Sequence, residues 1–94
     1  MDPDVKQAAL EYARREHQKN VAGERLEEAQ RDVDDFERTH PVMNSGEEEE
    51  RRDLVNLRAT RLNQYSLAKD ILEVAEEELE KACRRAYGSE GNSG

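Results

Sequence analysis

The sequence predicts an all-α fold, an antiparallel, coiled-coil-like hairpin of two long helices. Apolar residues recur at alternating steps of three and four along two stretches, which is the spacing of helices that pack side by side. These ladders consist of Val5, Ala8, Tyr12, Ala22, Leu26, Ala29, Val33 and Phe36, followed by Leu54, Tyr65, Ala68, Leu72, Ala75, Leu79, Ala82 and Ala86. A single proline, Pro41, separates the two stretches. The second stretch is therefore expected to fold back on the first.

The positions of the ladder residues predict how the two helices align. In an antiparallel hairpin, residues that face each other have positions with a constant sum. Phe36 and Leu54 add to 90, and Val5 and Ala86 add to 91. Charge favours the same alignment, because seven acidic residues between positions 24 and 37 face a basic stretch with Arg51, Arg52, Arg58, Arg61 and Lys69. Each exposed pair contributes only ~0.2–1 kcal/mol, but together the pairs disfavour other alignments.

The first helix is expected over about residues 3–39. Asp2 is a favourable N-cap, and Pro3 has the backbone angle that the first helical position requires. Pro41 moves the residue before it out of the helical conformation, so the helix should end just before this proline. A turn over 40–45 then leads into the second helix.

The second helix is expected over about residues 46–87. Ser45 and Glu48 have the spacing of a capping box at its start, and Gly88 is the expected C-cap. The segment 88–94 contains no apolar residue and is expected to be a disordered tail.

Composition limits the possible functions. The chain has 94 residues, of which 1–87 are expected to form one helical domain, and its net charge is −8. This negative charge argues against direct binding of nucleic acid or of a membrane surface, both of which require a basic face. The sequence shows no signal peptide and no apolar stretch long enough to span a bilayer, and the lone Cys83 fits a reducing compartment. We therefore expect a cytoplasmic protein.

A second apolar stripe on the second helix predicts self-association. Leu67, Ile71 and Val74 are spaced by four and three residues and lie outside the face that the first helix covers. A helix with so broad an apolar band is typical of a bundle in which two neighbours pack against it. We expect two hairpins to form a four-helix bundle, with these three residues contacting a second copy or a partner protein. The alternatives are a monomer with isolated exposed apolar side chains, or a larger or mixed oligomer.

Four basic residues occupy positions of the apolar ladders: Arg15, Lys19, Arg58 and Arg61. Long basic side chains can cover apolar surface with their methylene groups while the charge reaches water or a carboxylate. These residues are expected to specify the alignment of the helices at some cost in stability. The alternative is that they line a notch that binds a partner.

The sequence offers no catalytic constellation, and we expect neither enzymatic activity nor a cofactor nor a bound metal. The nearest approach is Glu37 and His40, which have the Glu-x-x-His spacing of di-metal carboxylate bundles. His40 stands next to Pro41 at the end of the helix, whereas metal ligands in such bundles lie in the middle of their helices. A di-metal helical-bundle enzyme is therefore the third and least favoured interpretation.

The most distinctive surface is acidic. Residues 70–80 carry no basic residue, and four of their acids define the acidic surface: Asp70, Glu73, Glu77 and Glu80. Such a face commonly keeps a small oligomer soluble. It could instead dock on the basic surface of a nucleic-acid-binding protein, as small inhibitors of viral origin do. The favoured function is a non-catalytic protein–protein interaction or assembly module built on a homodimeric hairpin, with the acidic inhibitor as the alternative.

Overall fold

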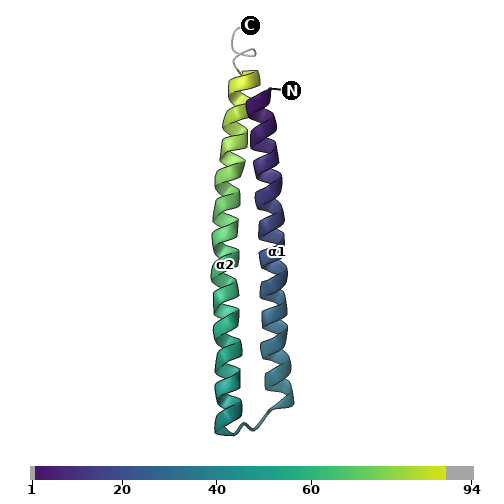
Figure 1. The fold of residues 1–94 in the computed structure, drawn as a ribbon, viewed down its shortest axis with the longest axis vertical. Coiled ribbons are helices and arrows are strands. Elements are labelled where there is room, and N and C mark those ends of the chain that lie inside the picture. The colour runs from purple at the N-terminus through teal and green to yellow at the C-terminus, as the bar shows by residue number, and fades with distance from the viewer. Residues whose placement is uncertain (1, 89–94) are drawn as a thin grey trace. The chain divides into compact units, whose positions relative to one another are not determined.

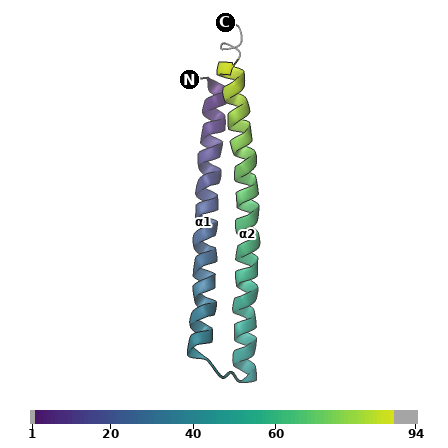
Figure 2. The same ribbon diagram turned by 180° about the vertical axis from the view of Figure 1, so that it is seen from behind.

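Two long α-helices make up most of the protein. The computed structural model describes residues 2–88, which form α1 (Pro3–Thr39), α2 (Ser45–Cys83) and a short π-helical segment, η1 (Arg84–Gly88). Figure 1 and the reverse view in Figure 2 show α1 and α2 packed against each other, which confirms the predicted all-α hairpin. None of the described residues lies in a β-strand.

The chain divides into two compact units, and both helices contribute to each. The turn unit comprises residues 20–67 and contains the connection between α1 and α2. The terminal unit comprises the first part of α1, up to residue 19, and the chain from residue 68 onwards.

In the terminal unit, α1 begins as the sequence predicts. The Asp2 carboxylate accepts hydrogen bonds from the backbone N–H groups of Asp4 at 2.8 Å and Val5 at 3.3 Å. These bonds satisfy two of the backbone donors that a helix start leaves without partners.

In the turn unit, α1 ends at Thr39, two residues before Pro41. The start of α2 differs from the prediction by one residue. Asn44, rather than Ser45, is the N-cap: its side-chain oxygen accepts a bond from Glu47 N–H at 2.8 Å, while the Glu47 carboxylate accepts one from Asn44 N–H at 3.2 Å. This reciprocal pair is a capping box, so Asn44 and Glu47 take the roles expected for Ser45 and Glu48.

The end of α2 also differs from the prediction. No described glycine has a positive φ, so Gly88 does not form the left-handed C-cap. The helix instead widens into η1 over Arg84–Gly88. The expected tail over 88–94 lies, apart from Gly88, outside the described residues.

The two units have different cores. In the turn unit, Val33 is 1% exposed and Ala29 3%, and both belong to α1. In the terminal unit, the buried residues are Val5, Ala75 and Ala82. Both cores thus consist of valine and alanine, but among the described residues the buried ones of the turn unit lie on α1 alone, whereas α2 supplies two of the three in the terminal unit.

The alignment of α1 and α2 can be measured in the turn unit. Arg51 of α2 contacts Glu37 of α1, and Arg58 contacts Gln30. Tyr65 lies so close to Gly23 that a Cβ atom added to this glycine would be 3.3 Å from the tyrosine ring. Each pair has positions that add to 88. The helices are thus offset by two or three residues from the predicted sum of 90 to 91, which is less than one helical turn.

Candidate interaction surfaces

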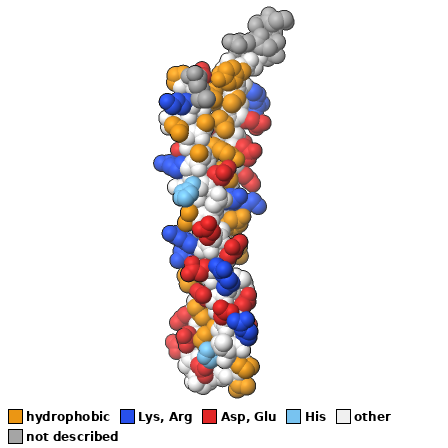
Figure 3. All heavy atoms as spheres, turned by 90° about the vertical axis from the view of Figure 1, so that its right-hand side faces the viewer, with side chains coloured by type: hydrophobic (Ala, Val, Ile, Leu, Met, Phe, Trp, Pro, Cys, Tyr) orange, Lys and Arg blue, Asp and Glu red, His pale blue; other side chains and the backbone are white. Residues whose placement is uncertain are grey.

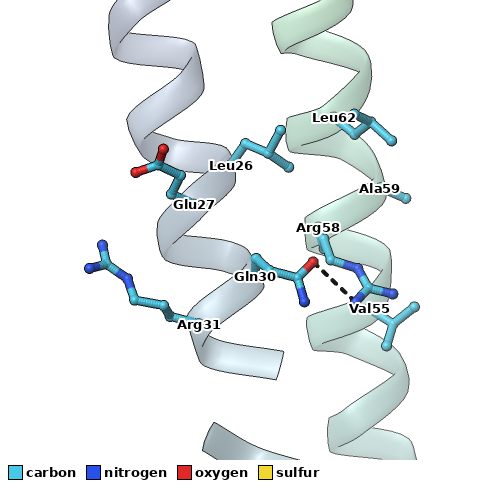
Figure 4. A pocket seen from close by; sticks show the side chains of 8 residues that line it. All are labelled: Leu26, Glu27, Gln30, Arg31, Val55, Arg58, Ala59 and Leu62. Atoms are coloured by element: carbon cyan, nitrogen blue, oxygen red, sulfur yellow. Dashed lines mark hydrogen bonds between the residues drawn. The ribbon is translucent and has the colours of Figure 1, made fainter. Parts of the chain in front are cut away.

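The turn unit carries an apolar groove beside the contact between α1 and α2. Its volume is about 720 Å³. Leu26 of α1 points toward α2, which supplies Val55, Ala59 and Leu62 (Figure 4). Leu62 is 50% exposed, although leucine is among the residues most often buried. We call this surface, with the charged residues described next, the turn groove.

Three charged residues line the turn groove, and none of them has an ionic partner among residues 2–88. The Arg58 guanidinium donates a 3.3 Å hydrogen bond to the side-chain oxygen of Gln30, a neutral group (Figure 4). Glu27 and Arg31 extend from α1 away from α2 and make no hydrogen bond within the described chain. The groove therefore has an apolar floor and charged edges that the chain itself does not neutralise.

The sequence analysis missed this groove. Val55, Ala59 and Leu62 are spaced by four and three residues, as are Leu67, Ile71 and Val74, twelve positions later on the same helix. This spacing was therefore a signal for the groove in the sequence, although a weak one, because Ala59 is small and Val55 directly follows the ladder residue Leu54.

The predicted stripe is exposed in part. Leu67, the last residue of the turn unit, is 61% exposed, and Val74 of the terminal unit is 58% exposed. Ile71 is half-buried, and in the terminal unit it lines a hollow of about 250 Å³ with Val74 and Ala8. Figure 3 shows apolar side chains reaching the surface among charged ones.

The charges around this smaller hollow are paired within the terminal unit. Glu11 accepts bonds from Arg15 at 2.7 Å and from Arg14 at 3.0 Å. Glu78 lies 3.7 Å from Lys81. Desolvation raises the pKa of Glu11, but the hydrogen bonds from the two arginines outweigh it, and the pKa falls below its usual value.

Tyr12 also lies in the terminal unit and has a perturbed hydroxyl group. A hydrogen bond to the Glu16 carboxylate raises its pKa, and the charge of Glu16, desolvation and the charge of Glu76 act in the same direction. Tyr12 belongs to α1 and Glu76 to α2, so this interaction also connects the two helices of the unit.

The four acidic residues singled out in the sequence are all exposed. Asp70, Glu73 and Glu77 form no ion pair with any other residue between 2 and 88. Glu80 lies 4.0 Å from Arg84, at the limit of an ion pair. This surface therefore retains most of its negative charge.

The four basic residues in the ladders are half-buried, as expected for side chains that cover apolar surface. Arg15 reaches Glu11, and Arg61 donates to the Gln64 side chain at 3.0 Å. Arg61 also lines a small hollow of the turn unit with Glu28 and Asp32.

Glu37 and His40 take part in contacts of the turn unit rather than forming a shared site. Glu37 pairs with Arg51 at 3.3 Å, and His40 lies 3.2 Å from the Glu47 carboxylate while its ring stacks on Phe36. Between residues 2 and 88, no three His, Cys, Asp or Glu side chains are placed to hold a metal ion together.

Neither long helix contains a stretch apolar enough to cross a membrane, within the described residues. Comparisons with protein-family models, with curated proteins and with solved structures find no match. The surfaces of the two units are therefore the basis on which a function can be proposed.

Proposed function

We propose that the protein is a non-catalytic interaction module that self-associates, two hairpins forming a four-helix assembly. One observation carries this proposal: the described chain leaves more large apolar side chains exposed than it buries. Five described apolar residues are buried, all of them valine or alanine, whereas seven valine, leucine and tyrosine residues are exposed, among them Leu57, Leu62, Leu67 and Val74 of α2. A single hairpin buries little surface, and a second hairpin would cover part of this exposed apolar surface.

Sedimentation equilibrium at micromolar concentration tests this proposal. The expected mass is twice the 10.8 kDa of one chain. Leu10→Glu is the matched control, because Leu10 is 59% exposed on α1 and lines neither the turn groove nor the terminal hollow. This variant should sediment as wild type does. A wild-type mass of one chain would overturn the proposal.

The second proposed role is binding another protein through α2. Leu67, Ile71 and Val74 supply apolar contacts, and the neighbouring acids Asp70, Glu73, Glu77 and Glu80 supply negative charge. The double variant Leu67→Ser, Val74→Ser should lose a partner that is captured from a lysate of the source cell. Retention of that partner by the double variant would contradict the apolar contact.

The alternative function, an acidic inhibitor of a basic protein, is favoured by the unpaired acids of the same helix. Reversing Glu73, Glu77 and Glu80 to lysine should then abolish capture, and high salt should release the partner from the unmodified protein. All three side chains are exposed, so helicity should be unchanged. Capture that withstands both high salt and the triple reversal would exclude this mechanism.

A further inference from the structure

We infer that the turn groove binds the turn groove of a second copy, with α1 against α1 and α2 against α2 in antiparallel pairs. This inference rests on the proposed self-association and specifies its surface. The turn groove is the larger of the two apolar surfaces described above, and its charged residues have no ionic partner within the described chain.

The apolar residues of α2 match themselves in this arrangement. When two copies of one helix pair antiparallel about a two-fold axis, facing residues have positions with a constant sum. Val55 and Leu62 add to 117, so each copy would place its Val55 against the other copy's Leu62. The axis then passes between Arg58 and Ala59, and the floor of each groove is covered.

The charged residues of α1 match themselves as well. Glu27 and Arg31 add to 58, so the Glu27 of each copy would face the Arg31 of the other, with the axis at Ala29. Neither side chain has a partner in its own chain, and both point away from the α2 of that chain. Two reciprocal ion pairs would therefore form at the edge of the interface.

One axis satisfies both helices. Within the turn unit, residues of α1 and α2 at the same level add to 88, as Gln30 and Arg58 do. Ala29 is therefore level with position 59 of α2, within half a residue of the axis that pairs Val55 with Leu62. Had the two patterns required axes at different levels, a single two-fold dimer could not have satisfied both. The reciprocal match of Glu27 with Arg31 at this level favours a second copy over an unrelated helix.

Charge exchange between Glu27 and Arg31 tests the arrangement. Glu27→Arg alone and Arg31→Glu alone each place like charges opposite each other twice, and each should weaken self-association about tenfold. A one-to-one mixture of the two variants restores both attractive pairs, although each chain keeps its own like-charged pair. Asp4→Arg, which reverses an exposed acidic charge in the terminal unit outside the proposed binding surfaces, is the control and should associate as wild type does.

Native mass spectrometry of the mixture gives the result. If two equally abundant chains pair at random, half of all dimers contain one copy of each variant. The proposed arrangement predicts that these mixed dimers make up clearly more than half. A fraction of one half or less overturns it, as do single variants that associate as wild type does. If wild type is dimeric, each of these outcomes leaves the proposed self-association intact, whereas a monomeric wild type overturns both.

Discussion

The turn unit and the terminal unit are built from the same two helices but leave different surfaces. In the terminal unit, Ala75 and Ala82 of α2 are buried together with Val5 of α1, and the charges that line its hollow are paired within the unit. The turn unit has an apolar groove whose charges have no ionic partner in the described chain. The difference is that the chain itself pairs the charges beside the terminal hollow, whereas it leaves those beside the turn groove available to the second copy that we propose.

The largest expected effects on stability come from removing side-chain volume from the core of the turn unit and adding it to the core of the terminal unit. Val33→Ala removes two methyl groups from a residue that is 1% exposed and should lower the free energy of unfolding by about 2 kcal/mol. Ala82→Leu adds volume to a site that is 3% exposed and should cost about 1–3 kcal/mol. Urea unfolding at fixed protein concentration measures both. A stabilising Ala82→Leu would contradict the close packing of the terminal unit.

Arg58→Met sharpens the comparison at the groove. In the paired arrangement each Arg58 lies beside the axis and so near the Arg58 of the other copy. An apolar side chain of similar length should therefore strengthen self-association by about 1 kcal/mol or more. Sedimentation over a range of concentrations measures this change. Weaker association would instead indicate that the groove receives an acidic group, as an unrelated acidic partner would supply.

The start of α2 provides a smaller effect. Asn44→Ala removes the side-chain oxygen that accepts the bond from Glu47 N–H and should cost about 1 kcal/mol, whereas Ser45→Ala should cost less than about 0.5 kcal/mol. Thermal unfolding followed by circular dichroism compares the two variants. The opposite ranking would restore Ser45 as the cap.

The sequence predicted the architecture because ladder spacing and proline placement are local signals. It placed the α2 cap one residue late, because Ser45–Glu48 and Asn44–Glu47 both fit a capping box and only the hydrogen bonds distinguish them. It found the exposed Leu67 and Val74 but missed the turn groove. That surface includes Leu26 of α1, and its extent depends on how α1 and α2 align, which the ladder gives only to within a turn.

The smallest expected effect concerns Tyr12. Its raised pKa means that the folded state favours the neutral phenol, so this contribution to stability is present below the ordinary tyrosine pKa and lost as pH rises through the raised value. Glu16→Gln should lower the Tyr12 pKa toward its ordinary value. Ultraviolet titration in a background with Tyr65→Phe and Tyr87→Phe isolates this group. An unchanged titration would show that the bond to Glu16 is not formed.

Hydroxyl-radical footprinting tests the central claim most directly, because it measures the solvent access of individual side chains in the unmodified protein. Within one chain, Leu62, Leu10 and Val74 are similarly exposed, at 50%, 59% and 58%. As protein concentration rises, oxidation of Leu62 should fall relative to Leu10, while Val74 should remain comparable to Leu10. A Leu62 to Leu10 ratio that does not change with concentration, or protection of Val74 in place of Leu62, would contradict pairing through the turn groove.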